Sequence, residues 1–131
     1  YLLTLKLSRA YSHLAVLGDH RIHGKDGKVD MTPLRHAIAL LESIRSQGET
    51  DPAWNARMGY STLMAYSSDA TAYEYARRWL ALAPEDPDAQ KLVRDCEGYL
   101  EEERTLALDL KEREEIIRRE TPGDGRDVIC K

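Results

Sequence analysis

Residues 72–84 read AYEYARRWLALAP, and this stretch decides the fold class that the sequence predicts. It is amphipathic at helical spacing, it places small residues at fixed offsets, and a proline ends it. A related segment begins at Ala37, which lies 35 residues before Ala72. A period near this length indicates helical hairpins stacked one on the next, an architecture that mostly binds other proteins.

Signals for helix starts and stops divide the chain into five helical segments. Three starts are written as an N-cap residue followed by proline, at Thr32, Asp51 and Asp86. A fourth is expected at Ser67-Ser68-Asp69, which can end one helix and cap the next. The repeated start signal favours a modular array over a bundle with unrelated loops. The predicted segments are 2–17, Thr32 to Gly48, Pro52 to near Ser67, 70–82 and 87–120.

The last segment is the longest. No proline interrupts residues 87–120 and the only glycine there is Gly98, which predicts one long helix, or two with a bend at Gly98. The last ten or so residues, within 121–131, have the composition of a loose tail. We therefore expect one domain, 1–120, divided into a hairpin 1–48, a hairpin 51–84 and the helix 87–120.

Composition limits the classes of partner. The formal charge is −4 without a basic block, which argues against nucleic acid or an anionic membrane. No apolar run approaches the ~20 residues of a membrane span. The predicted helix from Cys96 to Glu120 is roughly 36 Å long, and the ten residues from Glu120 to Cys130 reach back at most about 33–36 Å when fully extended. We therefore do not expect a disulfide between Cys96 and Cys130. Two unpaired thiols fit the reducing cytoplasm.

The pattern resembles the tetratricopeptide repeat (TPR) family. Ala72, Leu80 and Pro84 stand at the spacing of that family's small residue, late apolar residue and closing proline, and Gly59-Tyr60 matches its small-plus-tyrosine pair. The first hairpin repeats the resemblance, at Leu7, Ser8, Ala10, Tyr11, Ala37, Leu41 and Ile44. The resemblance covers about residues 1–100. It implies an all-α, right-handed stack of antiparallel helical hairpins, about two and a half repeats, with a long C-terminal helix.

The chain also departs from the family pattern. The polar loop Gly18–Thr32 is far longer than the family's tight turn, and Trp79 occupies a position where the family prefers alanine. Residues 53–97 are similar to repeat segments of multidomain bacterial proteins, and the chain begins at Tyr1 inside an apolar-periodic stretch. We therefore expect one module of a larger bacterial protein.

Such arrays bind peptides on the concave face, which the first helix of each hairpin lines. We expect that face to be a shallow groove for a peptide or protein partner. In the alternative interpretation, Trp54 and Met58 pack against the next hairpin, and Arg9 and Lys91 are solvated. The candidate groove residues are Arg9, His13, Trp54, Met58, Ser61, Lys91 and Asp95.

The long helix is the second candidate surface. Leu92, Cys96, Tyr99, Leu106, Leu110 and Ile117 follow a near-heptad course that Glu103 and Arg113 interrupt. Nothing else in the sequence covers the apolar residues beyond Leu100, namely Leu106, Leu108, Leu110, Ile116 and Ile117. Residues 100–120 are therefore a candidate surface for docking or for a homodimer, with Leu106, Leu110 and Ile117 as its candidate residues. The alternative is a helix that folds back as an extended cap over the second hairpin.

Metal binding and catalysis are less well supported. His20 and His23 lie in the glycine-rich loop with Asp19, Asp26 and Asp30 nearby, but zinc needs three or four ligands on a fixed scaffold. Residues 26–30 faintly resemble a calcium loop whose strongest ligand positions are lost. Cys96 and Ser61 have no histidine in a supporting motif, and Cys96 falls on an apolar stripe. We therefore predict a non-catalytic interaction module without cofactor or metal, an oligomerisation module as its alternative, and a metal-dependent activity at His20 and His23 as a third.

Overall fold

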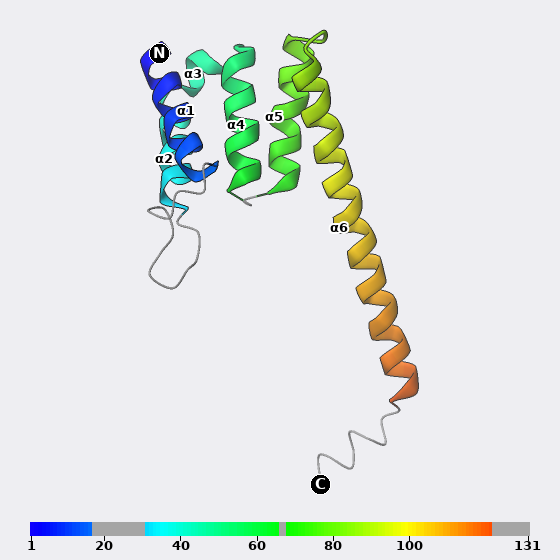
Figure 1. The fold of residues 1–131 in the computed structure, drawn as a ribbon. Coiled ribbons are helices and arrows are strands. Elements are labelled where there is room, and N and C mark those ends of the chain that lie inside the picture. The colour runs from blue at the N-terminus through cyan, green and yellow to red at the C-terminus, as the bar shows by residue number, and fades with distance from the viewer. Residues whose placement is uncertain (17–30, 66–67, 122–131) are drawn as a thin grey trace. The chain divides into compact units, whose positions relative to one another are not determined.

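The computed structural model describes residues 1–16, 31–65 and 68–121 (Figure 1), and within them the chain is all-helical, without a strand. The all-α class predicted from the sequence is confirmed for these residues. The predicted loop with His20 and His23, Cys130 and the predicted tail beyond Thr121 lie outside them. The helices are α1 (Leu2–Val16), α2 (Thr32–Ser43), α3 (Arg45–Gly48), α4 (Pro52–Met64), α5 (Asp69–Leu82) and α6 (Pro87–Glu120).

Most of the predicted helix starts are confirmed by their capping hydrogen bonds. The Asp51 carboxylate accepts from the backbone N–H of Ala53 at 3.0 Å, and the Ser68 hydroxyl accepts from that of Thr71 at 3.2 Å. Asp86 likewise accepts from the N–H of Asp88 at 2.9 Å. These bonds satisfy donors that the first turn of a helix leaves without partners.

The capping role predicted for Thr32 is wrong. Thr32 is already the first residue of α2, and Met31 precedes it with helical dihedrals, φ −84° and ψ 0°, and without a side-chain cap. Pro33 still lies in the first turn, where its missing N–H leaves no hydrogen bond unmade.

The predicted helix from Thr32 to Gly48 is also divided. α2 ends at Ser43, Ile44 leaves the helical region at φ −116° and ψ 19°, and the single turn α3 follows. The indole N–H of Trp54, in α4, donates to the Leu41 carbonyl at 2.8 Å. Trp54 therefore takes one of the carbonyls that the end of a helix leaves available.

Residues 1–97 form one compact unit, and residues from Gly98 onward form a second. In the first unit α1 pairs with α2 and α4 pairs with α5, while α4 also contacts α1, α2 and α3 (Figure 1). One core cluster joins α2, α4 and α5 through Leu41, Trp54, Met58 and Tyr75. A second joins α4 and α5 to the first turns of α6 through Ala56, Ala72, Ala76, Trp79, Ala89, Leu92, Val93 and Cys96.

α6 is a single helix, so the first of the two predicted alternatives is confirmed. Its buried residues, Ala89, Leu92, Val93 and Cys96, all belong to the first unit. Every residue from Glu101 to Glu120 is exposed.

Gly48 is required by the packing of Trp54. A Cβ at Gly48 would overlap the indole ring, whose position is fixed by its burial and by the hydrogen bond to Leu41. We predict that Gly48→Ala lowers the free energy of unfolding by about 1–3 kcal/mol, because overpacking forces the surrounding residues to shift. Urea denaturation followed by circular dichroism measures the change.

Gly98 provides the matched control, because it lies in α6 with nothing within 4 Å of the added Cβ. Gly98→Ala should be neutral or should stabilise the helix by roughly 0.5–1 kcal/mol. Equal destabilisation by the two substitutions would contradict the packing role of Gly48.

Candidate functional site

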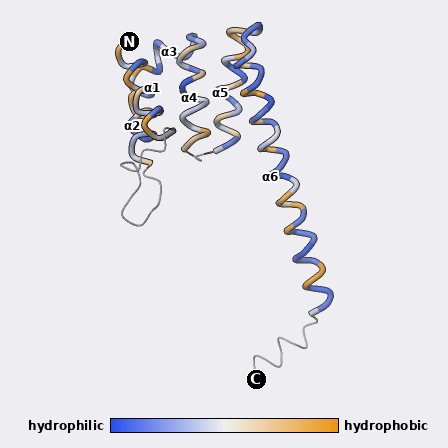
Figure 2. Tube along the Cα trace, in the orientation of Figure 1, coloured by the Kyte–Doolittle hydropathy of each residue, from blue (hydrophilic) through white to orange (hydrophobic). Residues whose placement is uncertain are grey.

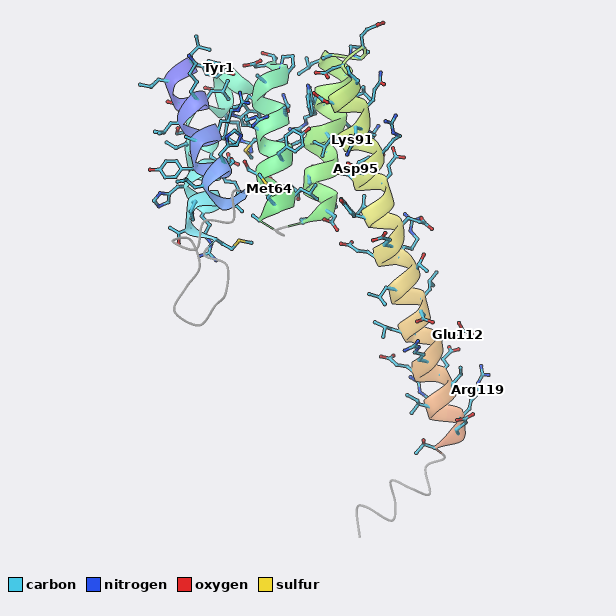
Figure 3. All side chains as sticks on the ribbon, in the orientation of Figure 1. Tyr1, Met64, Lys91, Asp95, Glu112 and Arg119 are labelled. Atoms are coloured by element: carbon cyan, nitrogen blue, oxygen red, sulfur yellow. The ribbon has the colours of Figure 1, made fainter. Side chains whose placement is uncertain are left out.

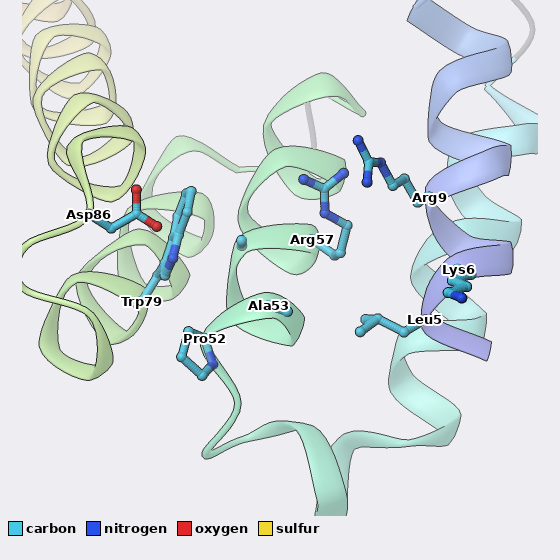
Figure 4. Close-up of a pocket in the computed structure, with 9 residues that line it drawn as sticks. Leu5, Lys6, Arg9, Pro52, Ala53, Arg57, Trp79 and Asp86 are labelled. Carbon is cyan, nitrogen blue, oxygen red and sulfur yellow. The ribbon is translucent and has the colours of Figure 1, made fainter. Parts of the chain in front are cut away.

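A cavity of the first unit lies between α1, α4 and the α5–α6 connection (Figure 4). It has a volume of about 420 Å³, within the range of ligand-binding cavities. α1 provides one side, α4 the floor, and Trp79 with Asp86 the opposite side. The lining residues are Leu5, Lys6, Arg9, Pro52, Ala53, Ala56, Arg57, Trp79 and Asp86.

Small side chains on α4 create this cavity. Ala53, Ala56 and Arg57 are spaced at i, i+3 and i+4, so they share one face of the helix. The two alanines leave room over the floor, and Arg57 lies at one end of it. Ala53 is exposed while Ala56 is buried against the core, so the floor can be altered at Ala53 without disturbing the interior.

Arg57 lacks an acidic partner among the described residues. Its side chain points toward Arg9 (Figure 4), and no ion pair to either arginine occurs in the part of the chain that the structure describes. Partial burial lowers the pKa of the Arg57 guanidinium, and the positive charge of Arg9 lowers it further. The two guanidinium groups therefore form a positive site that an anion would stabilise.

The other contacts of the cavity are aromatic and apolar. The Arg57 guanidinium lies 5.4 Å from the centroid of the Tyr60 ring, and Tyr60 meets Trp79 edge to face at 5.7 Å. Leu5, Pro52 and the indole of Trp79 add apolar surface to the lining. The cavity thus combines a cationic end with apolar walls.

Asp86 does not neutralise this cationic end. Its side chain lies beside Trp79, on the side opposite the arginines (Figure 4), and one carboxylate oxygen accepts the N–H of Asp88. Lys6 adds a third cation on α1.

The structure separates the seven predicted groove residues into two groups. Trp54, Met58 and Ser61 are buried, with 0%, 2% and 1% of their surface exposed. As exposed groove residues these three predictions are wrong, because their face of α4 packs into the core; Ser61, for example, hydrogen-bonds Ser12 of α1 at 3.2 Å. Trp54 and Met58 therefore pack into the core, as the alternative interpretation expected, but against Leu41 of α2 and Tyr75 of α5 and not against the following helix α6.

The other four predicted residues are exposed or partly exposed. Arg9 lines the cavity, and His13 lies further along α1. Lys91 and Asp95 form an ion pair of 2.7 Å on the surface of α6 (Figure 3), so each has a charged partner within the helix. Their role in binding stays a prediction.

The predicted groove residues of α4 lie one residue away from the side of the helix that faces the cavity. Trp54, Met58 and Ser61 each follow directly after a residue of the cavity side, namely Ala53, Arg57 and Tyr60, and one residue turns a helix by about 100°. The missed lining residues are Leu5, Lys6, Pro52, Ala53, Ala56, Arg57, Trp79 and Asp86. The spacing of Ala53, Ala56 and Arg57, which places two small residues and one cation on a single helix face, is the feature of the sequence that indicates this side of α4.

The remaining chemical candidates have these outcomes. Cys96 is a buried free thiol whose pKa burial raises to about 11, as expected for an inert cysteine. Among the described residues no group of three His, Cys, Asp or Glu side chains could hold a metal ion. The His20 and His23 site and the calcium-like segment 26–30 lie outside the described residues. None of the helices that the structure describes has the length and apolarity to cross a bilayer.

Comparison with known proteins adds no further constraint: neither family models, nor curated proteins, nor solved structures match this chain.

Because Arg57 has no acidic partner among the described residues, we predict that its loss does not destabilise the fold. We expect Arg57→Met to leave the free energy of unfolding unchanged or to raise it, since methionine keeps much of the packing and removes repulsion with Arg9. The gain should shrink at high salt, which screens that repulsion. Urea titrations at low and high salt measure both effects.

Arg45→Met is the matched control. Arg45 donates to Glu42 at 2.6 and 2.7 Å and to the Tyr75 hydroxyl at 2.6 Å, and it lies 5.1 Å from the centroid of the Trp54 ring. Its loss should cost about 1–2 kcal/mol. A comparable cost at Arg57 would show that the Arg57 charge stabilises the fold.

Proposed function

We propose that this chain is a non-catalytic scaffold that binds an acidic peptide segment in the cavity between α1 and α4. We further propose that its hairpins form a TPR-like stack within a cytoplasmic protein of bacterial origin. The pairing of α1 with α2 and of α4 with α5, and the contacts of both α1 and α2 with α4, support a hairpin stack. Complete burial of Ala37 and Ala72, the small residues that first suggested the repeat, supports it as well.

The observation that carries the binding proposal is the pair of arginines. Arg57 is half-buried, points toward Arg9 and has no acidic partner among the described residues. Two neighbouring guanidinium groups match the geometry of carboxylates, which they bind through paired hydrogen bonds. A ligand carboxylate would remove the repulsion between these cations, so part of the binding free energy comes from relieving it.

The rest of the cavity defines what should accompany that carboxylate. Trp79, Pro52 and Leu5 provide apolar contact away from the arginines. A volume of about 420 Å³ accommodates a few side chains rather than a folded domain. We therefore expect an extended or helical segment in which acidic residues flank an apolar one, bound with a Kd in the micromolar range or weaker, on the order of 10 μM to 1 mM.

A fluorescently labelled peptide, Gly-Glu-Glu-Leu-Glu-Glu-Gly, tests the proposal by fluorescence anisotropy. Its counterpart with glutamine in place of glutamate should bind at least about tenfold more weakly, since charge-assisted hydrogen bonds contribute roughly 1.5–3 kcal/mol each. Arg57→Met should weaken binding of the acidic peptide by a similar factor. Arg77→Met, an exposed arginine on α5 away from this cavity, should leave binding unchanged.

Filling the cavity tests the location independently of charge. Ala53→Leu should abolish binding without lowering stability, because Ala53 is exposed on the cavity floor. Ala81→Leu, an equivalent exposed alanine on α5, is the control. Equal binding by both variants, or equal binding of the glutamate and glutamine peptides, would contradict the proposed site.

A further inference from the structure

The second part of α6 carries an exposed apolar seam. Tyr99, Leu106, Leu110 and Ile117 are exposed by 42%, 58%, 51% and 62%, and all four belong to the second unit. Their positions fall on the two core positions of a heptad, where spacings of three and four alternate. Figure 2 shows hydrophobic positions recurring along α6 between hydrophilic ones.

Two charged residues complete the seam. Glu103 and Arg113 occupy the heptad core positions between the apolar ones, and both are exposed. The seam is symmetric about residue 108. Its positions form three pairs, each centred on 108: 99 with 117, 103 with 113, and 106 with 110. Under this symmetry the apolar positions correspond to apolar ones, and the glutamate corresponds to the arginine.

We propose that this seam pairs with the same seam of a second copy of the chain, antiparallel and centred on residue 108. In antiparallel coiled coils the two kinds of core position face each other, which is the correspondence found here. The pairing gives four apolar layers. In two of them Tyr99 of one copy packs against Ile117 of the other, and in two Leu106 of one copy packs against Leu110 of the other. Between them, Glu103 of each copy faces Arg113 of the other.

Charge selects this arrangement over the parallel one. In a parallel pair in register, each Glu103 would face the other Glu103 and each Arg113 the other Arg113, which is unfavourable. The antiparallel pair converts both contacts into ion pairs. Arg113 already has Asp109 at 3.4 Å within its own helix, so the second copy's Glu103 would extend that pair into a small network. The two Asp109 side chains come near the symmetry axis, where these arginines offset their repulsion.

The dimensions of the seam fit a modest dimer. From position 99 to 117 it is about 27 Å long at 1.5 Å per residue. It begins after Glu97, the last residue of the compact first unit, so none of its layers requires a residue of that unit. With four apolar layers we expect a weak, concentration-dependent association.

Charge exchange on the intact chain tests the orientation by sedimentation equilibrium over a range of concentrations. Glu103→Arg alone and Arg113→Glu alone should each weaken dimerisation at least about tenfold, because each turns two attractive contacts into repulsive ones. The double variant should restore much of it. A parallel dimer would respond little to either single change.

Two controls separate the seam from general effects on the helix. Arg119→Glu removes a similar pair within the helix, with Glu115 at 3.7 Å, but lies off the seam and should leave the dimer intact. Leu106→Glu with Leu110→Glu should give a monomer, whereas Leu108→Glu, at an equally exposed residue on the other face of the helix, should not. Circular dichroism verifies helicity in each variant.

Three results would overturn the proposal. They are a wild-type chain that is monomeric at every concentration, single charge changes without effect, and a double variant no better than the single ones. None of these outcomes involves a residue of the cavity, so they test the dimer independently of the proposed peptide binding.

Discussion

The buried indole of Trp54 is the interaction on which the rest of the first unit depends. It lies on α4 and is completely buried, donates to the Leu41 carbonyl of α2 and meets the Tyr75 ring of α5 edge to face at 5.7 Å. Gly48 leaves room for the ring, and Arg45 lies over it. One side chain therefore connects α2, α3, α4 and α5, and replacing such a buried tryptophan by alanine typically costs about 3–5 kcal/mol.

Two arginines of this unit show how the environment determines what a charge does. Arg45 has a carboxylate, a phenol and an aromatic face as partners, and these contacts hold its charge in place and stabilise the junction of α2, α3, α4 and α5. Arg57 has the face of Tyr60 and a like charge nearby, and no acid among the described residues. The contacts of Arg45 are all within the fold, whereas Arg57 is the residue on which the proposed binding site rests.

Much of the fold could be predicted because helix boundaries are local. Asp51, Ser68 and Asp86 cap their helices through hydrogen bonds to residues two or three positions away. Residues that are close in the sequence therefore determine where these helices begin. The break at Ile44 could not be found in this way. The break lies next to Leu41, whose carbonyl accepts the indole N–H of Trp54, and Trp54 is ten residues further along the chain than Ile44.

The candidate site was harder to predict for the same reason. α4 is surrounded by other helices and buries Asn55, Ser61 and Thr62 as well as Trp54, so its inward face has no simple apolar pattern. The prediction chose the face of α4 that carries the large side chains Trp54 and Met58, and that face is buried in the core. A cavity is formed by side chains that are small, and an alanine in a sequence does not reveal whether it makes room for a neighbouring helix or for a ligand.

The exposed alanine on the cavity floor has a consequence for how such a protein changes over time. Ala53 separates the shape of the cavity from the packing of the interior, because a larger side chain there would extend into the cavity and not into the core. Single substitutions at this position can therefore reshape the proposed binding site while the helices keep their arrangement. Under the proposed function, a lineage carrying this fold gains new partners without first losing stability.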